Sequence, residues 1–173
     1  MRHIPNLLCW LRMALAPWCA IAVAGGRREE AFVLIFAASL TDYFDGYLAR
    51  RWNCASPFGA LLDPAADKLF LSLVYIALGF ADKAPWWLVG LIFGRDLLIL
   101  CGAALLRLRV RQSKFPPTPA GKISTAIQMA GALAMLTWDS GIAVGAVATG
   151  TAISGLDYVR VGWHMIKDQE ASR

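Results

Sequence analysis

Long apolar runs alternate along the chain with short polar segments, and this pattern predicts an all-α fold of membrane-crossing helices. A helix needs about 20 mostly apolar residues to cross a bilayer. Six segments approach that length, separated by polar segments that include expected turns at 27–30 and 82–85. The expected transmembrane spans are 7–24, 31–50, a third that ends at 81, 85–106, 121–138 and 141–163. By its length, the whole chain 1–173 is expected to form a single domain.

The second and third spans reach crossing length only if they include acidic residues. The charge-free run 31–41 is too short by itself, so the second span has to contain Asp42 and Asp45 near its C-terminal end. The apolar run of the third span is also too short, which brings Asp63 and Asp67 into its N-terminal end. Because the two spans run in opposite directions and a short loop joins them, all four carboxylates are expected on the same side of the membrane.

The four aspartates are candidate metal ligands. Asp42 and Asp45 are three residues apart, and Asp63 and Asp67 are four apart, so each pair shares one helical face. Clustered carboxylates repel one another unless cations lie between them, and oxygen ligands favour Mg²⁺ or Mn²⁺ over Zn²⁺. The alternative is a structural network of ion pairs, whose cationic partners would come from Arg12, Arg50, Lys68 and Arg95.

The distribution of charge predicts the orientation. The chain is 58% hydrophobic and carries a formal net charge of +5, with a mean hydropathy of +0.52. Basic residues gather near both termini and in the segments 50–57 and 107–119, whereas Arg27, Arg28 and Lys83 on the other side lie next to acids. The positive-inside rule then places the aspartates at the cytoplasmic face, in a polar cavity among the six helices. Orientation and attraction to anionic lipid explain the basic excess, so no nucleic-acid partner is predicted.

One longer pattern contains all four aspartates. The spacing D-x2-D-G-x2-A-R-x8-G-x3-D-x3-D is met at every fixed position, by Asp42, Asp45, Gly46, Ala49, Arg50, Gly59, Asp63 and Asp67. In this pattern the chain resembles the CDP-alcohol phosphatidyltransferase family. The resemblance implies a membrane enzyme that transfers a phosphatidyl group from CDP-diacylglycerol to an acceptor hydroxyl and releases CMP. It implies the bacterial inner membrane with the active site facing the cytoplasm, or the mitochondrial inner membrane of a eukaryote.

The resemblance also implies roles for individual residues. Two divalent cations, Mg²⁺ or Mn²⁺, would be held by Asp42, Asp45, Asp63 and Asp67, and Asp67 would also act as general base on the acceptor hydroxyl. The donor-binding residues would be Gly46, Ala49, Arg50, Gly59 and Asn6, where small residues let the CDP group approach the backbone. The alternatives are close helix packing for the small residues, an interfacial anchor for the arginine and helix capping for the asparagine.

The acceptor is less strongly indicated. Different segments are similar to phosphatidylglycerophosphate synthases, which use glycerol-3-phosphate, and to CDP-diacylglycerol-dependent cardiolipin synthases, which use phosphatidylglycerol. Lys122, Arg160 and the basic segment 107–119 suit a doubly charged soluble acceptor, which favours glycerol-3-phosphate. Arg95 lies near the middle of its span, so its side chain is expected to face the bundle interior, where it orders a carboxylate or meets the acceptor. The resemblance also leaves a homodimer open.

Two functions of other classes fit the sequence less well. An ion or proton transporter would need polar residues that continue to the far side of the membrane, and the runs 31–41 and 69–81 contain almost none. A catalytically inactive, lipid-binding relative is disfavoured because none of the motif aspartates is missing.

Overall fold

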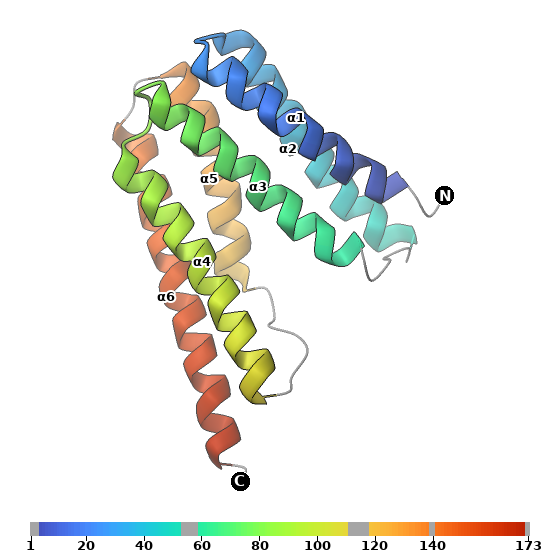
Figure 1. Cartoon of the computed structure of the whole chain (residues 1–173), viewed down its shortest axis with the longest axis vertical. Coiled ribbons are helices and arrows are strands. Elements are labelled where there is room, and N and C mark those ends of the chain that lie inside the picture. Colours follow the sequence, from blue (N-terminus) through green and yellow to red (C-terminus); the bar gives the residue numbers. More distant parts are fainter. Residues whose placement is uncertain (1–3, 53–58, 111–117, 139–140, 172–173) are drawn as a thin grey trace. The chain divides into compact units, whose positions relative to one another are not determined.

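The computed structural model describes residues 4–52, 59–110, 118–138 and 141–171, which form six helices and no strand (Figure 1). The helices are α1 (Ile4–Ala24), α2 (Arg28–Trp52), α3 (Gly59–Phe80), α4 (Trp86–Val110), α5 (Pro119–Thr137) and α6 (Gly141–Ala171). Side chains are described over narrower ranges: 13–41, 68–102, 104, 118–138, 141–165 and 167. The all-α prediction is confirmed for the described part of the chain.

Each helix coincides with one predicted span, but most helices extend beyond the apolar runs. α2 begins at Arg28, so the prediction of a turn at 27–30 is wrong for Arg28, Glu29 and Glu30. Glutamates suit the first turn of a helix because their charge is favourable near the positive end of the helix dipole. α4 continues to Val110 and α6 to Ala171, beyond the ends expected from hydropathy. A charged residue therefore ends an apolar run without ending the helix.

The turn between α1 and α2 depends on a glycine. Gly26 has φ of 70°, in the left-handed region that favours glycine. Its N–H donates to the carbonyl of Val23 at 3.1 Å, and the N–H of Arg27 donates to the carbonyl of Ala22 at 2.9 Å. This pair of hydrogen bonds is the Schellman motif, which satisfies carbonyls at a helix end. The motif ends α1 at Ala24 and allows α2 to start at Arg28, two residues after Gly26.

The described helices form two compact units. The first comprises 1–85 and 132–140, with α1, α2, α3 and the last residues of α5. The second comprises 86–131 and 141–173, with α4, α6 and the first part of α5.

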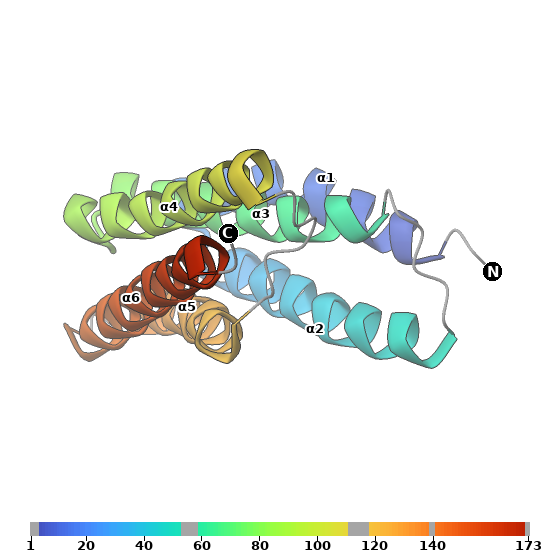
Figure 2. The ribbon, with the colours of Figure 1, turned by 90° about the horizontal axis from the view of Figure 1, so that it is seen from below.

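In the first unit, α1 packs against both α2 and α3 (Figure 2). The buried residues of α1 and α2 are mostly small, including Ala16, Cys19 and Ala22 on α1 and Ala31 and Ala38 on α2. Small residues at intervals of three, four or seven let helix backbones approach closely. Most of the larger buried side chains come from α3, and Ile35 of α2 joins them; those of α3 are Phe70, Leu71, Val74, Tyr75 and Leu78.

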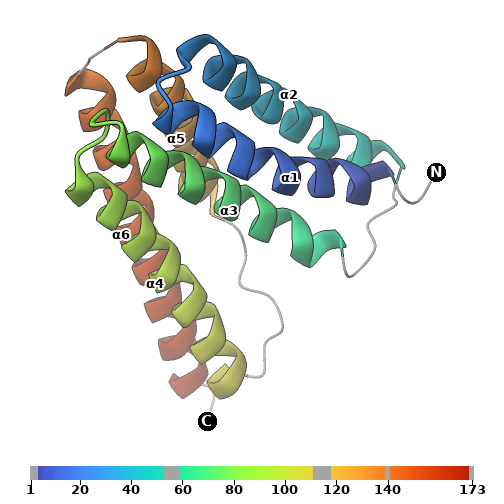
Figure 3. The ribbon, with the colours of Figure 1, turned by 45° about the horizontal axis from the view of Figure 1, so that its top comes forward.

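The directions of these three helices bring particular ends together. α1 and α3 run the same way and α2 runs the opposite way (Figure 3). The N-terminal ends of α1 and α3 therefore lie at the same end of the first unit as the C-terminal end of α2.

In the second unit, α4 packs against α6. Leu88, Ile92 and Arg95 are the buried positions of α4 that follow helical spacing. The matching buried positions of α6 are Val147, Thr151, Ser154 and Tyr158. Three of those four carry hydroxyl groups, so the interior of this unit contains a polar stripe.

Large apolar side chains are exposed on both units, among them Phe80, Trp138, Ile142 and Leu156, each more than 70% exposed. One segment of the described chain, Gly141–Met165, is long and apolar enough to cross a membrane by itself. Two further apolar helical stretches, Met13–Ala24 and Lys68–Phe80, are shorter.

Candidate functional site

The predicted metal ligands lie on two helices of the first unit. Asp42 and Asp45 belong to the C-terminal half of α2, and Asp63 and Asp67 belong to the first three turns of α3. These parts of α2 and α3 lie at the same end of the unit (Figures 1 and 3). The four side chains are outside those that the structure describes, so their joint metal site stays a prediction.

The predicted donor-binding residues belong to the same end of the first unit. Gly46, Ala49 and Arg50 are in the last turns of α2, Gly59 begins α3, and Asn6 is in the first turn of α1. Their side-chain contacts are also outside the described part. The backbone therefore gathers the segments of the whole motif, and the roles of its residues remain predictions.

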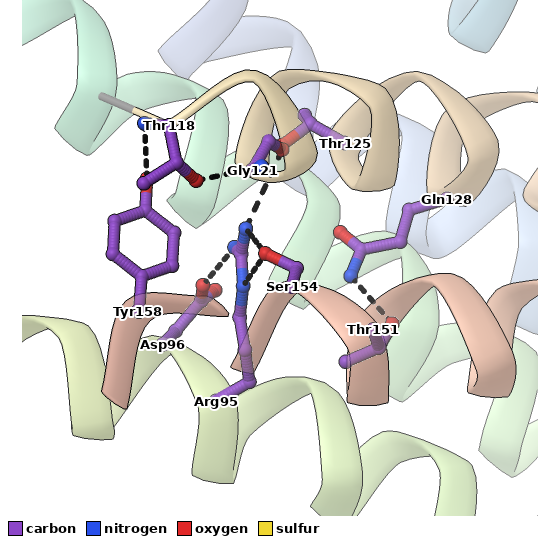
Figure 4. Close-up of polar contacts among 9 residues, drawn as sticks. All are labelled: Arg95, Asp96, Thr118, Gly121, Thr125, Gln128, Thr151, Ser154 and Tyr158. Carbon is purple, nitrogen blue, oxygen red and sulfur yellow. Dashed lines mark hydrogen bonds and ion pairs between the residues drawn. The ribbon is translucent and has the colours of Figure 1, made fainter. Parts of the chain in front are cut away.

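The second unit contains a described polar cluster around Arg95, only 8% of which is exposed (Figure 4). Its Nη2 donates to Oγ of Ser154 at 2.8 Å and to the carbonyl of Gly121 at 3.4 Å, and its Nε donates to the same Ser154 oxygen at 3.3 Å. Its Nη1 forms an ion pair with the carboxylate of Asp96 at 2.8 Å. The prediction that Arg95 faces the interior is confirmed, and the carboxylate that it orders belongs to its neighbour on α4.

Tyr158 is the aromatic member of this cluster. Its ring centroid lies 5.6 Å from the guanidinium carbon of Arg95, which is within cation–π range. Its hydroxyl accepts a long hydrogen bond of 3.5 Å from the backbone N–H of Thr118. The Thr118 hydroxyl in turn accepts from the N–H of Gly121 at 3.1 Å, as an N-cap does, and Pro119 occupies the first helical position. The start of α5 is thus held from both α4 and α6.

A second buried polar pair joins α5 and α6 further along these helices. Nε2 of Gln128 on α5 donates to Oγ1 of Thr151 on α6 at 3.0 Å (Figure 4). Ser124 lies between Gly121 and Gln128 on α5 and is 1% exposed, and its hydroxyl makes no hydrogen bond to any residue in the described part of the chain. The interface of α5 and α6 is therefore joined by polar contacts rather than by apolar packing alone.

The other predicted acceptor-binding residues are exposed. Lys122 follows Gly121 in the first turn of α5, and its backbone N–H donates to the carbonyl of Thr118 at 3.3 Å. Arg160 lies on α6, two residues after Tyr158. Ser154, Tyr158 and Gln128 were not predicted from the sequence to be partners in a cluster. Their signal in the sequence is the recurrence of polar residues at intervals of three and four.

The chain is similar to known proteins of one family over most of its length. Residues 2–154 match the CDP-alcohol phosphatidyltransferase family, a match that includes parts of both units. A Mycobacterium tuberculosis protein named "Probable phosphatidylglycerophosphate synthase" is 36% identical along an alignment of 171 positions, which covers 91% of this chain and 80% of that protein.

Two further relatives differ in how much of each chain is matched. A Salmonella choleraesuis protein named CDP-diacylglycerol--glycerol-3-phosphate 3-phosphatidyltransferase is 32% identical along an alignment of 178 positions, which covers 99% of this chain and 95% of that protein. A Rattus norvegicus cardiolipin synthase (CMP-forming) is 33% identical over 142 residues, covering 73% of this chain and 47% of its own.

Proposed function

Because the chain belongs to the CDP-alcohol phosphatidyltransferase family, we propose that it transfers the phosphatidyl group of CDP-diacylglycerol to a hydroxyl of glycerol-3-phosphate and releases CMP. The observation that carries this choice is the extent of the matches. Relatives named for glycerol-3-phosphate or phosphatidylglycerophosphate align with 91–99% of this chain and 80–95% of their own length. The cardiolipin synthase of the rat aligns with 73% of this chain and 47% of its own.

The reaction is a displacement at phosphorus. The acceptor oxygen forms a bond to the phosphorus of the phosphatidyl group, the bond from that phosphorus to the CMP oxygen breaks, and the hydroxyl proton goes to a base. Asp67 is proposed as this base, in agreement with its place in the motif. One α-helical turn separates it from Asp63, so the two carboxylates can lie on the same face of α3.

The chemistry of the aspartates fits a pair of divalent cations. Asp42, Asp45, Asp63 and Asp67 would supply only carboxylate oxygens, which Mg²⁺ and Mn²⁺ prefer, and their helical segments share one end of the first unit. When bound, the two ions would neutralise negative charge on the pyrophosphate of the donor.

Donor and acceptor call for different residues. Gly46, Ala49 and Gly59 lack bulk where the nucleotide would approach the backbone, while Arg50 offers charge to its phosphates and Asn6 an amide. The exposed cations Lys122 and Arg160 are proposed to bind the phosphate of the acceptor. Arg95 is not proposed to contact the acceptor, because it is only 8% exposed and its guanidinium group is bonded to Ser154, Gly121 and Asp96 within the second unit.

We further infer that the whole chain is one catalytic domain in the membrane, with its aspartates at the cytoplasmic face. The six helices have 19 to 31 residues, so each is roughly 28 Å or longer at 1.5 Å per residue, close to the thickness of a bilayer core. The exposed apolar side chains of both units support contact with lipid. The basic excess on one side favours the cytoplasmic orientation.

The direct test uses the purified chain in detergent with CDP-diacylglycerol, Mg²⁺ and either glycerol-3-phosphate or phosphatidylglycerol. CMP release should require glycerol-3-phosphate, and the lipid product should carry a terminal phosphate. CMP release with phosphatidylglycerol alone would establish the second candidate, a cardiolipin synthase, which the similarity to the rat enzyme favours. No CMP release with either acceptor would contradict both.

A further inference from the structure

The first turn of α5 is held by more contacts than an ordinary helix start. Thr118 caps it, the Tyr158 hydroxyl accepts from the N–H of Thr118, and Arg95 donates to the carbonyl of Gly121. Gly121 also has no room for a side chain, because an added Cβ would lie 2.6 Å from the Tyr158 hydroxyl oxygen. Contacts from α4 and α6 therefore both converge on this single turn.

Arg95 joins all three helices of the second unit. Its guanidinium group reaches Asp96 on its own helix, Gly121 on α5 and Ser154 on α6 (Figure 4). A buried cation needs such partners, and the fixed, planar donors of arginine can serve several at once, whereas a lysine ammonium cannot reproduce that geometry. The charge is compensated inside the unit by a carboxylate only 2.8 Å away.

Lys122 is the next residue after Gly121 and its side chain is exposed. Its backbone N–H is bonded to the carbonyl of Thr118, in the same turn that Arg95 and Tyr158 hold. A flexible lysine binds an anion more effectively when the backbone that carries it is already fixed, because less freedom is lost on binding.

We propose that Arg95 and Ser154 are positioning residues for Lys122: they fix the first turn of α5 so that the lysine ammonium group binds the phosphate of the acceptor. This inference rests on the proposed function for the identity of the acceptor. It gives Arg95 an indirect role, in which its present hydrogen bonds are kept during the reaction.

A double-variant cycle tests the proposal in the full-length protein. Ser154→Ala removes the oxygen that accepts two of the Arg95 hydrogen bonds, and Arg95→Lys removes the planar donors. Each should raise the KM for glycerol-3-phosphate about tenfold and change the KM for CDP-diacylglycerol by less than twofold. If Arg95→Lys does not fold, Ser154→Ala by itself carries the test. Lys122→Met should raise the same KM, and in its background Ser154→Ala should have no further effect, because the group that it positions is gone.

Thr151→Val is the matched control. It removes a described side-chain hydrogen bond between α5 and α6, from Gln128, without touching the first turn of α5. It should leave the KM for glycerol-3-phosphate within twofold of the wild-type value. An equal rise in Thr151→Val and Ser154→Ala would overturn the proposal in favour of a general packing effect. Independent, multiplying effects of Ser154→Ala and Lys122→Met would overturn it in favour of a direct contact.

Hydrogen exchange gives a readout that does not depend on the acceptor. Ser154→Ala should speed the exchange of the Gly121 and Lys122 amides about tenfold or more, with little change in the amides that follow Gln128. Unchanged exchange at Gly121 and Lys122 would overturn the proposal. If the wild-type enzyme uses only phosphatidylglycerol, the proposed function fails, but the same cycle run with that lipid and the exchange measurement still decide the positioning role.

Discussion

A Cβ atom at position 121 would lie 2.6 Å from the hydroxyl oxygen of Tyr158, so α5 can pass this close to the tyrosine only because residue 121 is a glycine. The tyrosine has little freedom to move away, because it is 9% exposed and its hydroxyl is bonded to the N–H of Thr118. The closeness of these two residues sets the distance between the start of α5 and α6.

Gly121→Ala should therefore destabilise the protein by about 1–3 kcal/mol, the usual cost of overpacking a filled interior. Thermal unfolding in detergent measures the effect. Gly145→Ala is the control, because Gly145 lies in a helix, is exposed and has no atom within 4 Å of an added Cβ. It should be neutral or slightly stabilising. Equal stability of the two variants would show that the Tyr158 contact does not constrain α5.

The N-cap of α5 can be tested separately. Thr118→Ala removes the oxygen that accepts from the N–H of Gly121 and should cost about 1 kcal/mol of stability. Thr149→Ala is the control, because the exposed Thr149 hydroxyl donates to the carbonyl of Gly145 one turn earlier in the same helix, α6. That change should stay within about 0.5 kcal/mol. Equal losses in urea or thermal unfolding would argue against capping by Thr118.

Asp67→Asn tests the proposed base. Asparagine keeps the shape of the side chain but cannot take the proton of the acceptor hydroxyl, so kcat should fall by about 10²- to 10⁴-fold. Binding of CDP-diacylglycerol, measured by calorimetry, should be weakened much less than turnover. A kcat within a few-fold of the wild-type value would remove Asp67 from the base role.

The membrane assignment predicts a simple extraction result. Exposed apolar residues such as Ile142 and Leu156 would need to face lipid in a polytopic protein. Washing membranes that contain the expressed chain with alkaline carbonate should leave it in the pellet, and mild detergent should release it. Release by carbonate alone would contradict the six-span assignment.

The sequence predicted the order and class of the helices well, and their ends less well. Hydropathy locates apolar runs, and it misses polar turns that remain helical, such as Arg28 to Glu30 at the start of α2. The interior position of Arg95 followed from its depth in the span. Its partners could not be predicted, because Gly121 and Ser154 are 26 and 59 residues away and helical periodicity does not give the register between helices.

For the aspartates, unlike the partners of Arg95, the prediction came from the sequence itself. Their spacing alone indicated a shared function, and the antiparallel directions of α2 and α3 agree with the expected placement of their segments at one end (Figure 3). The sequence cannot give the distances between the four side chains on the two helices. If α2 and α3 slid past one another by one helical turn, Asp45 and Asp63 would move apart, and the motif in the sequence would be unchanged.

Counting bound cations tests the central claim most directly. Mn²⁺ titrated into the purified protein with CDP-diacylglycerol, and followed by electron paramagnetic resonance, should give two tightly bound ions per chain. Asp42→Asn on α2 and Asp63→Asn on α3 should each remove at least one of them. Wild-type binding of two ions in both variants, or no tight binding in the unmodified protein, would contradict a metal centre shared by the two helices.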